Sequence, residues 1–507
     1  MVTPNKLKQL FSDEASVISR EFLYLGKTAT VLCLDTVSSK DNINLFIVKP
    51  MLDAQAKPAA SQGTANSGKG SGKGERGKQG SGESGKGQNS ESSSIMEHLK
   101  NSVILQTELA LESDLQELKK ALLMGDAVLF VEGEPDALVV DNKEWAVRGI
   151  AEPPTAAVLK GPREGFNENL KDNISLIRRK IKSEKLVVER AVVGRYTNTN
   201  VAVMYIDGIA DKQIVKDVMR RINEMDIDGI LDSAYITKYL ETSRYSLFKQ
   251  VGNTEKPDVA AGKMLEGRIC IFVDGSPIAL TVPFIMLEDL QSPSDYFTKN
   301  SRATMIRGLR ILAVFMALYL PAIYVSLVEH HTHVIKFRFL LTIMNASANL
   351  PLSPKHEILV VVLFFEILHE SALRMPRHIG MAVSVVGALV LGETAVRAGM
   401  LSTPAVMIAA LSGIALYNVP DAEGTFSTIR ILFVIIAGAL GFYGLIIGSM
   451  MLLVYLATFE SYSVPYLAPF SPMVLHDMKD AVLKSNPDEL TERPYSIPTK
   501  NRQRVAP

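Results

Sequence analysis

The sequence predicts an α/β soluble tandem domain, built from a duplicated unit, followed by an α-helical polytopic membrane domain. The membrane part is predicted because residues 311–327 and 429–459 are almost uninterruptedly apolar. A bilayer core about 30 Å thick needs roughly 20 such residues per helix. The N-terminal part lacks apolar runs of this length, and its short β-like segments occur in corresponding pairs. Such internal similarity predicts two copies of one structural unit.

The duplication is visible in two pairs of segments. Residues 29–35 (ATVLCLD) and 200–207 (NVAVMYID) are β-like runs that end in an aspartate and precede a helix-like segment. Residues 125–135 (GDAVLFVEGEP) and 267–277 (GRICIFVDGSP) correspond more closely. A strand, an acidic residue followed by Gly, and a second strand are typical of a β-hairpin. We therefore expect each unit to contain this hairpin.

The unit boundaries follow from these matches. The first unit is predicted over 1–60 plus 94–190, and the second over 191–300. Residues 61–93, between the two parts of the first unit, are rich in Gly, Ser and Lys and contain no large apolar side chain. They are predicted to be a disordered insertion, although their basic character also allows an electrostatic contact with anionic membrane. Residues 165–189 are predicted as a helix from apolar side chains at helical spacing: Leu170, Ile174, Ile177 and Ile181.

Composition excludes several classes of function. The chain has 54 basic and 54 acidic residues, so no global basic field indicates nucleic-acid binding. Its two cysteines, Cys33 and Cys270, each lie in an apolar β-like run and are predicted to be buried structural thiols. The first 25 residues do not resemble a signal peptide. The soluble part should therefore stay on the side where it is made, with the first membrane helix as an internal anchor.

The membrane domain is predicted over 301–460, with four or five spans and re-entrant elements. The predicted spans are 303–328, 356–372, 379–398 and 429–459. Residues 337–346 are too short to cross and are interpreted as interfacial or re-entrant. Residues 404–417 form either a short span or a half-helix. The number of crossings, five or four, then decides on which side of the membrane the polar tail at 461–507 lies. Basic residues near the ends of the spans favour the cytoplasmic side for the soluble domain, and the basic end of the tail favours the same side.

The predicted span 379–398 has two distinct faces. Small residues recur every fourth position and suit close helix packing: Gly380, Ser384, Ala388 and Gly392. The other face carries the candidates for a pore and gate: Ala382, Val386, Val390, Glu393 and Arg397. In a ring of subunits this face would form a hydrophobic constriction followed by charged rings. Alternatively, the valines face lipid and Glu393 pairs with Arg397 at i,i+4 on the same helix.

Ionisable residues also occur in the predicted span 356–372. Glu366, His369 and Glu370 share one helix face and are predicted to form an intramembrane polar network, with an ion pathway as the alternative. A di-metal site in a helical bundle would need a second Glu-x-x-His helix and further carboxylates, so no metal is expected. Three histidines just beyond the first span are interpreted as a solvated interfacial cluster: His330, His331 and His333.

The loop that follows residue 159 combines turn-forming residues, charges and an aromatic ring. It is either a structural turn or a contact between subunits or subdomains, and it comprises Lys160, Gly161, Pro162, Arg163, Glu164, Gly165 and Phe166. It lacks the GK[ST] of a phosphate loop. Because no HExxH, GxSxG or paired metal-ligand motif occurs elsewhere, neither enzymatic activity nor a cofactor is predicted.

Several of these segments together resemble the A subunits of GerA-type spore germinant receptors of endospore-forming bacteria. The similar stretches, in chain order, are 159–168 (LKGPREGFNE), 173–179 (NISLIRR), 370–376 (ESALRMP), 387–396 (GALVLGETAV) and 464–472 (VPYLAPFSP). The resemblance covers nearly the whole chain from residue 20 onward. No single motif is specific, but their combination and order are.

The resemblance implies a receptor subunit in the inner membrane of the dormant spore rather than an enzyme. Its partners would be a permease-like B subunit that recognises the nutrient and a lipoprotein C subunit. The A subunit would form a homo-oligomer, a pentamer in this family, with a cation-permeable channel whose opening starts germination. Two alternatives remain open. One is a non-conducting scaffold that transmits the partner's conformational change, and the other is the sporulation-specific paralogue of the A subunit.

Overall fold

The computed structural model describes most of the chain. The described residues are 2–56, 95–106, 108–143, 161–243, 245–348, 350–374 and 392–504. The predicted linker at 61–93 lies outside them. So do Lys160 and six of the residues singled out in the span 379–398: Gly380, Ala382, Ser384, Val386, Ala388 and Val390. The chain divides into two compact units, residues 1–150 with 169–189 and residues 151–168 with 190–507.

The first unit contains a five-stranded sheet with the strand order β1-β2-β4-β5-β3. Its strands are β1 (Val17–Tyr24), β2 (Lys27–Leu34), β3 (Leu109–Glu112), β4 (Ala127–Val131) and β5 (Ala137–Val140). Alternate side chains of β2 enter two separate cores. Val31 and Cys33 contribute to the core that also holds Ile47 and Met51, whereas Leu32 contributes to the core that holds Leu118 and Leu122. Both faces of the sheet are therefore buried.

Helical segments supply the other half of each core. One core receives residues from 43–48, from α3 (Lys49–Ala56) and from α4 (Ile95–His98). The other receives residues from α1 (Pro4–Lys8) and α5 (Leu115–Met124). Local sequence sets the limits of α5, because the Asp114 side chain accepts a hydrogen bond from the Gln116 N–H and Gly125 ends the helix with φ of 96°.

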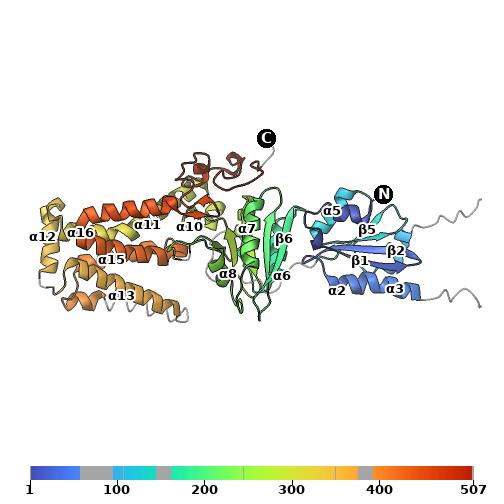
Figure 1. Cartoon of the computed structure of the whole chain (residues 1–507), viewed down its shortest axis with the longest axis horizontal. Helices are drawn as coiled ribbons and strands as arrows, with labels where there is room; N and C mark the ends of the chain where they lie inside the picture. Colours follow the sequence, from blue (N-terminus) through green and yellow to red (C-terminus); the bar gives the residue numbers. More distant parts are fainter. Residues whose placement is uncertain are drawn as a thin grey trace, which may run out of the picture. The chain divides into compact units, whose positions relative to one another are not determined.

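The second sheet has the corresponding strand order, β6-β7-β9-β10-β8. Its strands are β6 (Leu186–Val193), β7 (Thr199–Ile206), β8 (Gly252–Thr254), β9 (Ile269–Val273) and β10 (Ala279–Val282). Helices α7 (Lys212–Asn223), α8 (Ser233–Leu240) and α9 (Pro257–Leu265) accompany it (Figure 1). The predicted hairpins are confirmed, since β4 pairs antiparallel with β5 and β9 with β10. Both cysteines are buried, as predicted.

The predicted helix over 165–189 is too long. The structure forms α6 only over Leu170–Lys180, and Ile181 is already extended at ψ of 91°. The chain then enters β6 at Leu186. Consecutive β-branched residues, Val187 and Val188, favour a strand, and the neighbouring strand β7 provides hydrogen-bond partners that local periodicity does not reveal.

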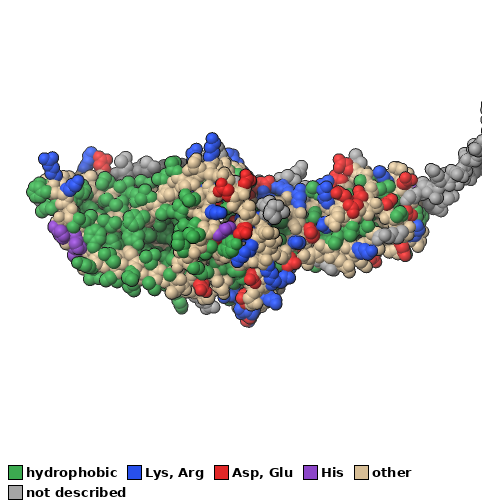
Figure 2. Space-filling view, turned by 90° about the horizontal axis from the view of Figure 1, so that it is seen from above, with side chains coloured by type: hydrophobic (Ala, Val, Ile, Leu, Met, Phe, Trp, Pro, Cys, Tyr) green, Lys and Arg blue, Asp and Glu red, His purple; other side chains and the backbone are tan. Residues whose placement is uncertain are grey.

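The helical domain, residues 300–458, contains five α-helices whose bounds lie within the described residues. They are α11 (Asn300–Glu329), α12 (Phe337–Ser347), α13 (Pro354–Arg374), α15 (Thr403–Leu416) and α16 (Glu423–Thr458). Two described helical stretches, Asn300–Glu329 and Pro420–Thr458, are long and apolar enough to cross a membrane. Hydrophobic side chains gather over this domain (Figure 2). The expected helices at 303–328, 337–346, 356–372 and 404–417 correspond to α11, α12, α13 and α15.

The predicted span 429–459 forms two helical arms rather than one straight helix. Gly441 has φ of 61° and ψ of −146°, which interrupts α16. A methyl group built on Gly448 would lie 3.5 Å from Ile436 Cδ1 and 3.6 Å from Phe433 Cε1. In a straight helix, residues 433 and 448 would be separated by roughly 22 Å. The two arms of α16 therefore form a helical hairpin that turns at Gly441.

The two ends of the helical domain can be distinguished by their contacts. At the proximal end, Thr425 donates a hydrogen bond to the Leu247 carbonyl and Tyr455 donates one to Ser246. Both arms of α16 thus meet the segment that follows α8. At the distal end, the His330 ring lies 3.1 Å from the Gly438 carbonyl oxygen, beside the Gly441 turn.

The C-terminal tail, residues 461–507, returns to the second α/β domain (residues 191–299). Arg493 donates a hydrogen bond to the Leu265 carbonyl oxygen at 2.7 Å, and the Lys500 N–H donates one to Ile209. Ile497 is fully buried. The tail and the second α/β domain therefore lie at the same end of the helical domain. The side of the membrane on which the tail lies stays a prediction.

Substitution of Gly441 by Ala should destabilise the protein by about 1–3 kcal/mol. An alanine would be strained at positive φ, and its methyl would lie 2.8 Å from His331 Cε1. The matched control is Gly413→Ala in α15, where a methyl would meet nothing within 4 Å. The measurement is thermal unfolding in detergent. Equal unfolding temperatures for the two variants would contradict the hairpin geometry.

Candidate functional site

A buried arginine joins four helices of the helical domain. Arg430, in the first arm of α16, donates hydrogen bonds to Ser412 of α15 at 3.3 Å and to Ser427 at 3.2 Å. It also pairs with Glu366 of α13 at 3.3 Å. Ser412 in turn donates to the Ala317 carbonyl of α11 at 2.9 Å. The Arg430 side chain is only 2% exposed, so these partners compensate for a charge removed from water.

His369 extends the network toward the proximal end. Its Nε2 lies 3.2 Å from the Glu423 carboxylate, and its ring stacks on Tyr417 at 5.5 Å. Glu370 instead pairs with Arg374 on its own helix at 2.5 Å. The structure thus brings two of the three predicted network residues, Glu366 and His369, against other helices. Within the described part of the chain, no group of three or more His, Cys, Asp or Glu is arranged to hold a metal ion.

The described end of the predicted pore helix carries an ion pair. Glu393 and Arg397 lie 2.5 Å apart, and both side chains are exposed. Gly392, from the small-residue stripe, lines an apolar cavity of about 20 Å³ with residues of α13 and α15. A methyl group on Gly392 would lie 3.7 Å from Val406. Gly392 therefore lies against neighbouring helices, whereas Glu393 and Arg397 are exposed at the surface of the domain.

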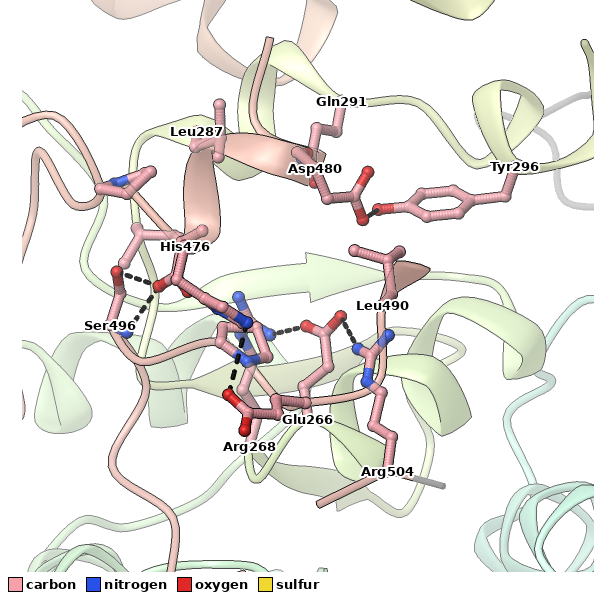
Figure 3. A pocket seen from close by; sticks show the side chains of 15 residues that line it. Glu266, Arg268, Leu287, Gln291, Tyr296, His476, Asp480, Leu490, Ser496 and Arg504 are labelled. Carbon is pink, nitrogen blue, oxygen red and sulfur yellow. Dashed lines mark hydrogen bonds and ion pairs between the residues drawn. The ribbon is translucent and has the colours of Figure 1, made fainter. Parts of the chain in front are cut away.

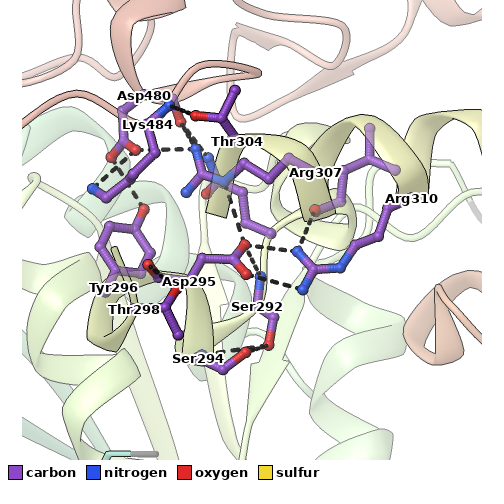
Figure 4. A network of polar contacts seen from close by, with 12 residues as sticks. Ser292, Ser294, Asp295, Tyr296, Thr298, Thr304, Arg307, Arg310, Asp480 and Lys484 are labelled. Carbon is purple, nitrogen blue, oxygen red and sulfur yellow. Dashed lines mark hydrogen bonds and ion pairs between the residues drawn. The ribbon is translucent and has the colours of Figure 1, made fainter. Parts of the chain in front are cut away.

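A second network lies at the base of α11 (Figure 4). Arg310 binds both carboxylate oxygens of Asp295, at 2.6 and 3.0 Å, and Arg307 approaches the same carboxylate at 3.3 Å. Arg307 also donates to the carbonyl oxygen of Asp480 at 2.6 Å and pairs with its carboxylate at 3.1 Å. Asp295 precedes α11 and Asp480 belongs to the tail. Two arginines thus join the start of the helical domain to the C-terminal tail.

The protonation of Asp295 reflects this pairing. Burial alone would raise the pKa of its carboxyl, but hydrogen bonds from Arg310 and the Ser292 N–H, together with the positive charges, lower it below the usual value. Tyr296 donates to the Asp480 carboxylate at 3.1 Å, and Lys484 lies 4.0 Å from the centre of the Tyr296 ring. The Asp295 carboxylate is therefore held in its charged form.

The tail and the second α/β domain enclose a small cavity of about 60 Å³ (Figure 3). Glu266 lies at its centre and pairs with Arg268 and, at 2.8 Å, with Arg504 from the end of the tail. His476 lies 3.1 Å from Asp477 and 3.5 Å from Glu492. Arg504 thus ties the end of the tail to the α/β domain, whereas the His476 contacts lie within the tail.

The loop 161–166 packs within its own unit. Gly161 has φ of 116°, and a methyl there would lie 2.6 Å from the Phe297 ring. Pro162 accepts a hydrogen bond from the buried Lys256. Phe166 is buried and packs edge-on against Phe272 at 5.1 Å. Arg163, Glu164 and Gly165 lie between these two anchors. Turn chemistry and an intramolecular contact both contribute here, and a contact with another subunit stays a prediction.

Sequence reasoning missed Arg430, Asp295 and Asp480. A signal for Arg430 was present, because an arginine within a long apolar run must find a partner. Asp295 and Asp480 gave no such signal, because an aspartate within a polar segment is not unusual. Arg307 and Arg310 were interpreted as basic flanks of a span, whereas the structure places both in ion pairs.

Comparison with known proteins shows the family to which this chain belongs. The family model described as Bacillus/Clostridium GerA spore germination protein matches residues 5–496. The chain belongs to the GerA family. Among its relatives, spore germination protein KA of Bacillus subtilis is 40% identical over 395 residues, which is 78% of this chain and 73% of the relative.

Two further relatives and one solved structure extend this comparison of the GerA-family chain. The membrane protein YfkQ of Bacillus subtilis is 34% identical, covering 81% of this chain and 80% of YfkQ. GerLA of Bacillus cereus is 30% identical, covering 81% and 84%. The crystal structure of the N-terminal domain of the A subunit of the Bacillus megaterium spore germinant receptor GerK3 matches at 26% identity. Its TM-score is 0.37, and the match covers 55% of this chain and 91% of that domain.

Removal of the buried arginine should destabilise this GerA-family protein. We expect Arg430→Met to cost about 2 kcal/mol, because Ser412 and Glu366 lose a charged hydrogen-bond donor. The partner Glu366 is 41% exposed, which keeps the cost below that of a fully buried pair. The control, Arg397→Met, removes an exposed pair and should cost less than about 0.5 kcal/mol. Chemical unfolding in detergent measures both, and equal costs would contradict a structural role for Arg430.

The ion pairs of Asp295 should make the stability of the protein depend on pH in the acidic range. Because the folded-state pKa is lowered, the stabilisation is present above the unfolded pKa of about 3.9 and is lost as pH falls through the folded pKa. The wild-type unfolding temperature should therefore fall more steeply below about pH 4 than that of Asp295→Asn, which should be less stable at pH 7. The exposed Asp488→Asn is the control. Parallel pH profiles for wild type and Asp295→Asn would refute this assignment.

Proposed function

We propose that this chain is the A subunit of a nutrient germinant receptor in the spore inner membrane. It would act with a permease-like B subunit and a lipoprotein C subunit to trigger germination, with its N-terminal domains on the cytoplasmic side. Family membership supports the process. The observation that carries the mechanism is the junction formed by Asp295, Arg307, Arg310 and Asp480. It ties the first helix of the helical domain to the tail, which is itself bound to the second α/β domain.

The apolar surface of the helical domain supports its placement in a bilayer. Large side chains are exposed along both α11 and α16, among them Phe315, Tyr443, Ile446 and Met450. An exposed apolar surface of this extent is costly in water and typical of contact with lipid or another protein. α11 has the length that a bilayer requires. Each arm of α16, with roughly 18 residues on either side of Gly441, lies at the lower end of the required range.

Channel activity is the finer part of the proposal. The chain would form a homo-oligomer, a pentamer by family resemblance, in which the face of Val386, Val390, Glu393 and Arg397 lines a cation pore. The exposure of Glu393 and Arg397 supports this assignment, because both are available to neighbouring subunits or to water. A non-conducting scaffold is the alternative, favoured by the pairing of the two charges within one helix.

The duplication belongs to the same proposal. The corresponding order of strands in the two sheets supports descent of both α/β units from one ancestral unit. The tandem arrangement would allow one copy to contact partner subunits while the other is bound to the tail.

Potassium efflux from liposomes tests the channel. Val386→Ala with Val390→Ala should increase efflux about ten-fold over wild type, because smaller side chains widen a hydrophobic constriction. A control substitution, Val454→Ala, makes the same change at a single exposed position in α16 and should leave efflux unchanged. Each variant is first shown to be folded and oligomeric. Negligible efflux from both variants, also with the B and C subunits present, would favour the scaffold.

A further inference from the structure

The short helix α12 has three faces that meet different surroundings. Ile343 is its one buried side chain among the described residues and belongs to the main core of the helical domain. Phe337, Leu341 and Met344 share a second face at i, i+4 and i+7 and are 72%, 41% and 56% exposed. The third face carries the polar residues Arg338, Thr342 and Asn345, all exposed. Phe339, 56% exposed, lies between the polar face and Ile343. The protein therefore covers one side of α12 and leaves an amphipathic surface uncovered.

The position of α12 restricts what can cover this surface. It follows the distal end of α11, and α13 begins soon after it, with Lys355 pairing with Glu329 across the connection at 3.8 Å. With 11 residues, α12 is too short to cross a bilayer. If α11 and α13 cross a membrane, as the proposed function requires, both connections hold α12 at the distal membrane surface.

The charge around α12 favours an anionic surface. Lys336 and Arg338 lie at its N-terminal end and are exposed. His330, His331 and His333 precede it. The nearest acidic residue before the helix, Glu329, is already paired with Lys355, and α12 itself contains no Asp or Glu. Amphipathic helices of this kind bind at the boundary between headgroups and acyl chains, and their basic residues attract anionic lipids.

We propose that α12 is an interfacial helix that binds anionic phospholipid headgroups at the distal membrane surface. Phe337, Leu341 and Met344 enter the acyl boundary, while Lys336 and Arg338 contact the phosphate groups. This inference rests on the proposed placement of the helical domain in a membrane. It assigns a lipid-binding site to the connection between α11 and α13, and it selects an interfacial helix over a re-entrant one.

Tryptophan fluorescence in vesicles tests this site. The chain has one tryptophan, Trp145, so Trp145→Phe provides a silent background for the full-length protein. Single reporters are then introduced as Phe337→Trp on the apolar face, Thr342→Trp on the polar face and Leu453→Trp on the exposed side of α16. Vesicles contain phosphatidylcholine with a minor fraction of phosphatidylglycerol, and bromine atoms on the acyl chains quench nearby tryptophan.

The expected results distinguish the depth of α12 in the bilayer from the attraction of its basic residues to anionic lipid. Phe337→Trp should be quenched roughly two-fold by bromines near the headgroup end of the chains, and Thr342→Trp should be quenched much less. When only phosphatidylglycerol is brominated, the quenching of Phe337→Trp should be greater than a random distribution of phosphatidylglycerol at its mole fraction in the vesicle would give. Lys336→Gln with Arg338→Gln should remove that excess, whereas Lys479→Gln in the tail should not.

Each other outcome overturns a distinct statement. Quenching of Leu453→Trp without quenching of Phe337→Trp would show that water or another copy of the chain covers α12, while the membrane placement stands. Equal, deep quenching of Phe337→Trp and Thr342→Trp would indicate a re-entrant helix. Quenching in proportion to mole fraction would refute selectivity for anionic lipid. Absence of quenching at all three reporters would refute the membrane placement itself, and with it the proposed function.

Discussion

Charges buried in an apolar environment need partners, and this requirement organises the helical domain. Arg307 and Arg430 are among the largest fully buried side chains of the described residues. Neither can be satisfied by its own helix alone, because an α-helix already uses its backbone acceptors internally. Arg430 therefore requires α13 and α15 beside α16, and Arg307 requires the tail beside α11. The two side chains specify which segments assemble together, as well as stabilising them.

The position of the C-terminal tail follows from the same requirement. Without Asp480, Arg307 would keep one carboxylate partner, Asp295, which it shares with Arg310. The tail in turn depends on the second α/β domain, where Arg493 and Arg504 find backbone and carboxylate acceptors. The polar C-terminal residues are thus an integral part of the fold. They form a second connection between the α/β domain and the helices, in addition to the direct link that precedes α11.

The sequence was sufficient where one segment alone determines the structure. Apolar runs located α11 and α13, and acidic-Gly turns located the hairpins β4–β5 and β9–β10. It was insufficient where the structure depends on a distant partner. Gly441 is one of several glycines in a uniformly apolar run, and only its backbone conformation shows that the run folds into a hairpin. The partners of Glu366 and Arg430 were likewise hidden, because helix adjacency is a property of the assembled domain.

These networks restrict the movements by which a signal could pass through the molecule. Separating α13 from α16 would leave the buried Arg430 without its carboxylate partner, at a cost of about 2 kcal/mol. Moving α11 away from the tail would do the same to Arg307. A rotation that keeps α11, α13, α15 and α16 together at the proximal end preserves both ion pairs. For a receptor subunit, a change in the α/β domain would therefore displace these helices as a group.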